Sequence, residues 1–330
     1  MYDNKIMLKS QEEDLACDAE ILTDKSGSGR ERPWRKYKMA SEYLSTAYLE
    51  VNEKKSERLK ACGKALVFDV DSQGQKKLVH MDSCRVRLCP LCSWRRSLKA
   101  YHNAMSIVQK ISVDYPEMQY IFVTLTIQNC QAENLSGTLD LMFESLKRLM
   151  KRKEIQGVWQ GIIRNMEVTH NLDRDSQWFD TYHPHFHLLV AVKPSYFKKH
   201  YISRQKLAQL WQECLRVDYL PQVDMRACYD ATPHIVAEAS KYAAKASDYL
   251  IMQDWDLTVE TVATLDKALH KRRLIAYSGI MKQIKAQLKL EDVEDGSLVN
   301  VGENDSMWQD KETHKEIYWW YSGFMQYRKI

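Results

Sequence analysis

Two histidines separated by one residue are the first feature of this chain that could do chemistry. His185 and His187 belong to the segment His-Pro-His-Phe-His-Leu-Leu-Val, which begins at His183. Alternate side chains of a β-strand share a face, so both imidazoles would lie on one face, about 6–7 Å apart along the backbone. Two imidazoles at that spacing can bind one metal ion. A strand whose polar face carries two unrelated histidines has the same pattern.

A carboxylate on the preceding strand is the candidate third ligand. Glu167 lies in a strand expected over about residues 158–169, which a polar turn joins to the histidine strand. If the two strands pair as a hairpin, one carboxylate and two imidazoles surround a divalent ion and leave positions for phosphate oxygens, as Mg²⁺ or Mn²⁺ chemistry requires. A solvated acid on the strand face is the alternative for Glu167. His183 shares the alternation of the histidine pair and stays open as a ligand in its place.

A second group of reactive side chains falls in a helix expected over residues 232–245. Pro233 suits the first helical position. Glu238, Tyr242 and Lys245 follow at spacings of four and three residues, so they share one side of the helix. An acid, a phenol and a cation on one face can act together on a phosphate, although a surface ladder of charges around a half-buried tyrosine has the same spacing.

Four cysteines form a second candidate metal site. Cys84, Cys89 and Cys92 are close in sequence, and the Cys-Pro-Leu-Cys turn aims two thiolates at one point. Tetrahedral Zn²⁺ needs a fourth ligand, for which Cys62 is favoured over His80. A hairpin expected between Cys62 and Cys84 makes the module similar to a zinc ribbon. Buried, inert cysteines are the alternative.

Charge favours a nucleic-acid partner. The net charge is only +4, but residues 291–310 contain seven acids and no lysine or arginine, so the rest of the chain is strongly basic. Basic side chains crowd around the cysteine module, where they could contact phosphates: Arg85, Arg87, Arg95 and Arg96.

The expected elements indicate an α+β fold, a partly antiparallel sheet with helices packed on it. Apolar periodicity predicts helices over residues 34–59, 93–112, 135–150 and 203–215, and further strands over residues 120–127 and 223–228. The expected domains are a flexible N-terminal arm (1–33), a helix with the cysteine module (34–98), a domain with the histidines (99–250) and a C-terminal helical region with an acidic loop (251–330).

The location is expected to be cytoplasmic. No apolar run approaches the ~20 residues of a membrane span, and residues 1–20 lack the apolar core of a signal peptide. In that compartment, cysteines are reduced or metal-bound rather than disulfide-paired.

These motifs together resemble one family, the rolling-circle replication initiators of small plasmids from Gram-positive bacteria, which are HUH endonucleases. Three segments are similar, in order, to the three motifs of the family: residues 122–126, 183–187 and 238–245. Three more segments are similar to other stretches of the family: residues 32–35, 84–96 and 269–277. The likeness spans about residues 30–292. The three motifs and the cysteine-rich stretch occur in the order found in the family, and four matches in that order are specific for it.

The resemblance implies an HUH-like central antiparallel sheet and a site-specific nickase. Tyr242 would attack the scissile phosphate beside Mg²⁺ or Mn²⁺ held by His185, His187 and Glu167. The products are a 5′-phosphotyrosine and a 3′-OH primer. Tyr249, seven residues after Tyr242, stays open as a second nucleophile.

The resemblance also assigns roles around that tyrosine. Glu238 would activate water at termination, while Lys245 and Lys241 would contact the phosphate. The implied partners are plasmid origin DNA, nicked as a single strand, and the host helicase and replication machinery, with no membrane. A homodimer stays open. The alternatives are an HUH relaxase or transposase, and a non-catalytic zinc-ribbon DNA-binding regulator.

Overall fold

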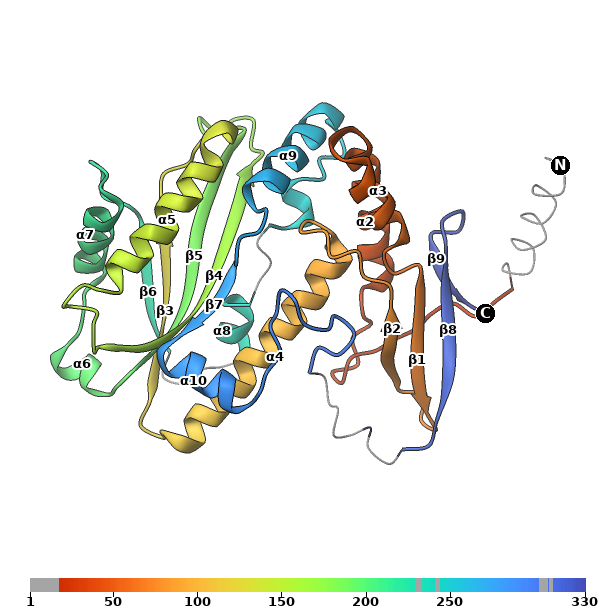
Figure 1. The fold of residues 1–330 in the computed structure, drawn as a ribbon, viewed down its shortest axis with the longest axis horizontal. Helices are drawn as coiled ribbons and strands as arrows, with labels where there is room; N and C mark the ends of the chain where they lie inside the picture. The colour runs from red at the N-terminus through yellow and green to blue at the C-terminus, as the bar shows by residue number, and fades with distance from the viewer. Residues whose placement is uncertain (1–17, 229–232, 241–243, 303–307, 309–310) are drawn as a thin grey trace. The chain divides into compact units, whose positions relative to one another are not determined.

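The computed structural model describes residues 18–228, 233–240, 244–302, 308 and 311–330. The chain divides into two compact units (Figure 1). The first unit comprises residues 1–92 and 298–330, and the second comprises residues 93–297. The histidines lie in the second unit and the four cysteines in the first.

The second unit is built on a five-stranded sheet in the order β6-β3-β5-β4-β7. Every pairing in this sheet is antiparallel. The strands are β3 (Gln119–Thr126), β4 (Trp159–Asn171), β5 (Thr181–Val192), β6 (Val223–Cys228) and β7 (Ile275–Ser278). The expected antiparallel sheet with helices packed on it is therefore present.

Helices cover both faces of this sheet. Apolar side chains of α4 (Pro90–Asp114), α8 (Pro233–Glu238) and α10 (Gly279–Gln287) pack on one face, against Phe122 and Leu189 among others. On the other face, Phe186 contacts Phe143 of α5 (Leu135–Leu149) and Trp211 of α7 (Arg204–Leu215). The other helices found in the described residues of this unit are α6 (Ser195–Lys199), α9 (Trp255–Ala268) and the short 3₁₀ helices η1 (Ala132–Asn134) and η2 (Ala246–Asp248).

The two-sided cover explains the residue pattern of β5. On one face of the strand, Phe186, Leu188 and Val190 are fully buried. The opposite face begins with the histidines and then also turns apolar, because the next side chains, from Leu189 onward, lie under α4, α8 and α10. Polar side chains are thus confined to the beginning of β5, which places the candidate site near one end of the sheet.

The first unit contains a four-stranded antiparallel sheet in the order β2-β1-β8-β9. Its strands are β1 (Ala65–Asp71), β2 (Lys76–Met81), β8 (Thr313–Tyr321) and β9 (Gln326–Lys329). Among the described residues of this unit, residues 34–61 form two helices, α2 (Trp34–Val51) and α3 (Glu53–Ala61), where one helix was expected. They are separate because Asn52 is extended and caps α3 with its side chain.

This sheet changes the expected domain boundaries. The hairpin of β1 and β2 was anticipated, but β8 pairs along the whole of β1. The last residues of the chain are therefore strands of the first unit, not part of a C-terminal helical region. A pairing between segments some 240 residues apart leaves no trace in local periodicity, which is why the sequence did not predict it.

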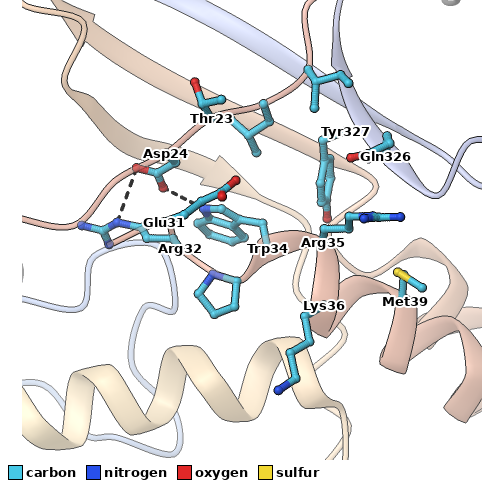
Figure 2. A pocket seen from close by; sticks show the side chains of 13 residues that line it. Thr23, Asp24, Glu31, Arg32, Trp34, Arg35, Lys36, Met39, Gln326 and Tyr327 are labelled. Carbon is cyan, nitrogen blue, oxygen red and sulfur yellow. Dashed lines mark hydrogen bonds and ion pairs between the residues drawn. The ribbon is translucent and has the colours of Figure 1, made fainter. Parts of the chain in front are cut away.

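The N-terminal segment is also anchored, contrary to the expected free arm. Residues 1–17 lie outside the described part, but the Lys329 amide donates to the Glu20 carbonyl (2.9 Å) and the Leu22 amide to the Tyr327 carbonyl (3.0 Å). Figure 2 shows the cavity of about 530 Å³ that this segment lines. There Asp24 accepts a hydrogen bond from the Trp34 indole (2.7 Å) and pairs with Arg32 (3.4 Å).

No helix within the described ranges is both long enough and apolar enough to cross a membrane.

A buried carboxylate ties three strands of the first unit together. Glu316 of β8 is 7% exposed and forms ion pairs with Lys76 of β2 and Lys329 of β9. The Tyr318 hydroxyl donates a third hydrogen bond to it (2.8 Å). Burial opposes ionisation, but the bonds from the two lysines and the tyrosine outweigh it and lower the pKa of Glu316 to about 2.

We predict that Glu316→Gln destabilises the first unit by about 3 kcal/mol at neutral pH, since it leaves two lysines without their buried partner. The folded-state pKa of this carboxyl is depressed, so its stabilisation is present above the unfolded value and is lost as the pH falls from about 4.5 toward 2. The unfolding midpoint in denaturant, measured across that range, should fall more steeply for the wild type than for the variant. Glu312→Gln, at an exposed position, is the control, and equal midpoints for the two variants would contradict the prediction.

Candidate metal centre and nucleic-acid interface

The register of β4 against β5 brings the predicted metal ligands together. Glu167 is directly opposite His185, and Asn165 is opposite His187. The Glu167 Oε2 atom lies 3.2 Å from Nε2 of His187 and 3.6 Å from Nε2 of His185. One ligand atom from each residue falls within 4.8 Å of the others. This two-nitrogen, one-oxygen donor set fits a divalent ion with open coordination positions.

Hydrogen bonds on the far side of each imidazole fix its orientation. Nδ1 of His187 lies 3.3 Å from the Thr124 hydroxyl, and Nδ1 of His185 lies 3.1 Å from the carbonyl oxygen of His183. Phe122 also stacks on the His187 ring, with 5.4 Å between the ring centroids. With a metal ion bound, each Nδ1–H would donate to its oxygen partner and the Nε2 lone pairs would be free for the ion.

The carboxylate is held in its charged form. Burial of Glu167, which is 3% exposed, opposes ionisation. Hydrogen bonds from His185 and His187 and the charge of Lys245 outweigh burial, so the pKa of Glu167 is lowered well below its usual range. Glu167 is therefore a carboxylate anion near neutral pH, the form that could bind a divalent cation.

A second carboxyl group and a lysine complete the surroundings of Glu167. Nζ of Lys245 lies 3.4 Å from Oε1 of Glu167 and remains half exposed. Asp248 accepts a hydrogen bond from the Lys245 amide (3.2 Å), which helps to fix the backbone that carries this lysine. Burial raises the pKa of Asp248. An exposed cation beside a buried acidic metal ligand suits an approaching phosphate.

Two residues that the sequence left open, His183 as a metal ligand and Tyr249 as a second nucleophile, lie in positions less suitable for those roles. His183 is not part of the group of three ligand atoms, and burial together with His185 lowers its pKa to about 4. Tyr249 is 1% exposed, so its hydroxyl is not accessible to a DNA strand in this conformation.

The third motif is only partly described. The helix expected over residues 232–245 ends at Glu238, where α8 stops, and Lys245 has an extended backbone. Glu238 is half-buried on the helix that packs against the histidine face of the sheet. Tyr242 and Lys241 lie outside the described residues. Among the described residues, α8 ends at Glu238, residues 239–240 form a turn and Lys245 is extended, so one helical face does not extend from Glu238 to Lys245.

The four cysteines converge in the first unit. The Sγ atom of Cys62 lies 3.5 Å from that of Cys92 and 3.6 Å from that of Cys89, and Cys84 lies 3.7 Å from Cys92. Sulfur ligands at the usual Zn–S distance of about 2.3 Å around a tetrahedral ion are about 3.8 Å apart, so the spacing fits zinc. His80 is instead exposed and pairs with Asp82.

The pKa values of the thiols show how a bound cation would change their protonation. Hydrogen bonds from the other thiols, together with burial, raise the pKa of Cys62. For Cys89, burial opposes ionisation, but hydrogen bonds from the neighbouring thiols outweigh it and lower the pKa. A bound divalent ion would hold all four as thiolates. Nearby, the buried Lys38 donates 2.9 Å hydrogen bonds to the carbonyls of Lys60 and Cys62.

The arginines predicted to contact DNA divide into two groups. Arg85 is exposed, with a left-handed φ of 54°, and Arg87 is half-buried. Arg95 and Arg96 are 1% and 9% exposed, so they do not offer a free guanidinium in this conformation.

Sequence reasoning missed the residues that orient the ligands. Thr124 lies opposite His187 across β3 and β5. A threonine at the same alternation phase as the histidine, on a strand expected to pair with it, was the available signal. Asp248 gave no comparable signal, since its role depends on the backbone turn before Tyr249.

The chain matches one protein family over most of its length. Residues 75–328 fit the family described as Replication protein. The chain belongs to this family. The resemblance inferred from the motifs is confirmed at that level.

Individual relatives are similar to this chain over three quarters or more of its length. A protein named Protein rep from Bacillus amyloliquefaciens is 36% identical, over 92% of this chain and 95% of its own length. Proteins of the same name from Streptococcus pneumoniae and a Bacillus species are 33% and 39% identical, over 87% and 75% of this chain and 89% and 85% of their own lengths. No solved structure matches the chain significantly.

We predict that Thr124→Val weakens Mn²⁺ binding about tenfold, because the His187 ring loses the partner that fixes its orientation. Isothermal titration of the metal-free protein with Mn²⁺ measures the change. The matched control is Thr126→Val, whose hydroxyl donates to the Gln222 carbonyl (2.8 Å) and to no metal ligand. Equal Mn²⁺ affinity in the two variants would show that Thr124 does not act on the site.

We also predict that the wild type carries one zinc per chain and that Cys62→Ser loses it, since three thiolates leave the tetrahedral site incomplete. Elemental analysis of the purified protein measures the zinc, and thermal unfolding measures the accompanying loss of stability. Cys214→Ser replaces a buried cysteine outside the cluster and should keep the metal. A wild type without bound zinc would refute the assignment.

Proposed function

We propose that this chain initiates rolling-circle replication of a plasmid by nicking single-stranded origin DNA. The observation that carries the proposal is the group of Glu167, His185 and His187, whose ligand atoms lie within 4.8 Å of one another with Lys245 alongside. Membership of the replication protein family supports the biological role. The chemistry at the site is our inference from these residues.

The donor set defines what the metal site contributes. Mg²⁺ or Mn²⁺ held by Glu167, His185 and His187 would polarise the scissile phosphate and offset its negative charge. Lys245 adds a second positive charge on the exposed side of Glu167. The phosphate is thereby positioned next to the segment that follows α8.

Tyr242 is the proposed nucleophile. It precedes Lys245 by three residues, so the chain alone keeps their Cα atoms within about 11 Å. Its phenol oxygen would attack phosphorus, forming a phosphotyrosine bond to the 5′ side as the bond to the 3′ oxygen breaks. The leaving oxygen takes up a proton and becomes the 3′-OH that primes synthesis, while the phosphotyrosine conserves the bond energy for rejoining.

Glu238 is the proposed base at termination. It lies at the end of α8, on the histidine side of the sheet, and a carboxylate there can take a proton from water that attacks phosphorus. Hydrolysis would then release the strand without a second tyrosine. The burial of Tyr249 agrees with this single-tyrosine route.

The rest of the chain would support this reaction. Zinc at the four cysteines would stabilise the first unit, and Arg85, Arg87, Lys241 and Lys245 would contact phosphates. Host helicase and replication machinery would act after the nick, in the cytoplasm.

The decisive experiment is a covalent-adduct assay. A labelled single-stranded oligonucleotide carrying the plasmid nick site is incubated with protein and Mn²⁺, then separated on a denaturing gel. We predict that Tyr242→Phe abolishes the adduct, because no phenol oxygen remains to attack. Glu238→Gln should retain or accumulate it, because hydrolysis is slowed.

Tyr249→Phe is the matched control and should form the adduct like the wild type. An adduct that persists in Tyr242→Phe would place the nucleophile elsewhere. DNA binding without an adduct under any divalent metal would favour a non-catalytic regulator instead.

A further inference from the structure

A cluster of basic side chains in the second unit lies outside the metal site. It comes from two segments, the connection between α5 and β4 and the stretch from the end of β5 to the start of α7. We call it the α6 patch and define it by its exposed members: Lys151, Lys153, Lys193, Lys198, Lys199, Arg204 and Lys206. Residues 193–206 contain no acid at all.

The charge of this patch is not neutralised within the protein. None of its seven members forms an ion pair with any acid in the described part of the chain, whereas their neighbours do. Lys147 pairs with Glu144 (2.7 Å), and Arg152 pairs with Glu213. Seven like charges held together repel one another, so an anionic partner would stabilise this surface.

The two segments meet at a shallow pocket of about 370 Å³. Lys153 lines it from the connection after α5, and His200 and Lys206 line it from the stretch around α6. Glu154 is the single acid among the lining residues. Cations from separate segments thus converge on one hollow, as a site for phosphate groups requires.

One rigid strand, β5, connects the patch to the metal centre. Trp159 and Val192 are paired at the end of the sheet where both segments attach. His187 lies five residues earlier on β5, which at about 3.3 Å per residue is about 17 Å away. That distance corresponds to about five base pairs of B-form DNA. Because α4, α8 and α10 cover the histidine face between His187 and this end of the sheet, DNA from the metal site would pass around these helices to reach the patch.

The side chains favour duplex DNA over a single strand. Surfaces that bind single strands present several aromatic rings on which bases stack. Here Tyr201 is 61% exposed, whereas Tyr196 is 1% exposed and Phe197 is half-buried. Many cations around one exposed ring match recognition of a phosphate backbone rather than of unstacked bases.

We propose that the α6 patch binds the phosphate backbone of duplex DNA next to the nick site. It would hold the double-stranded flank while the metal centre acts on the single strand. This inference rests on the proposed function for its location, but not for the binding itself.

The test compares Lys153→Glu/Lys206→Glu with Lys267→Glu/Lys282→Glu in the full chain. The control makes the same change in net charge at exposed lysines of α9 and α10. Binding to a short labelled duplex of mixed sequence is measured by fluorescence anisotropy over a range of salt concentrations. The patch variant should bind the duplex about tenfold more weakly. Its affinity should also fall less steeply with salt concentration, by the equivalent of about two phosphate contacts. The control should bind like the wild type.

The duplex-binding assay tests the α6 patch, and the adduct assay tests the proposed function of the metal centre. Unchanged duplex binding in the patch variant, or an equal loss in the control, would overturn the proposal. If the patch variant lost affinity for the matching single strand to the same extent, single-stranded DNA would be the partner of the patch. That result would also overturn the proposal. Adduct formation on a single-stranded oligonucleotide should be retained in the patch variant. If the wild type itself forms no adduct, the proposed nicking function is refuted, while the duplex-binding measurement still tests whether the α6 patch binds DNA.

Discussion

The antiparallel register between β4 and β5 is the constraint on which the candidate site depends. It places Glu167 opposite His185 and within 3.2 Å of the His187 imidazole. A slip of one residue would turn Glu167 to the other face of the sheet, where α5 packs. Burial favours this register, because a one-residue slip of β5 would turn the two imidazoles toward α5 and α7, where Phe186 is buried.

The same register gives the site its electrostatic character. Glu167 is buried yet ionised, since two imidazoles and Lys245 surround its oxygens. Thr124, on the strand at the other side of β5, fixes one of those imidazoles. A central strand flanked by two partners can therefore bring candidate ligands from two strands, and a hydrogen-bond partner from a third, to one point. The carboxylate, the imidazoles and their hydrogen-bond partners all belong to rigid elements, which is what preorganised binding of a cation and a phosphate needs.

The first unit uses long-range pairing in a different way. Its cysteine module would be a two-stranded hairpin with little core if only the local sequence contributed. β8 and β9, from the other end of the chain, extend this hairpin to four strands and bring Glu316 between Lys76 and Lys329. The four thiols lie beside this sheet, and the Tyr327 hydroxyl of β9 donates to the carbonyl of Gly63, next to Cys62 (2.6 Å).

The sequence by itself determined the types of residue that could do chemistry and the elements that carry most of them. Alternation placed His185 and His187 on one face of a strand, the Cys-Pro-Leu-Cys turn marked a thiolate site, and the motif order indicated the family. The placement of the histidines on one strand and the convergence of the cysteines are confirmed because side-chain periodicity and turn geometry are local, while the metal sites stay predictions. Tertiary structure decided the rest: the pairing of β8 with β1, the burial of Arg95 and the end of α8 at Glu238. The strand pairing and the burial of Arg95 depend on contacts between residues far apart in the chain, whose energies no local pattern records.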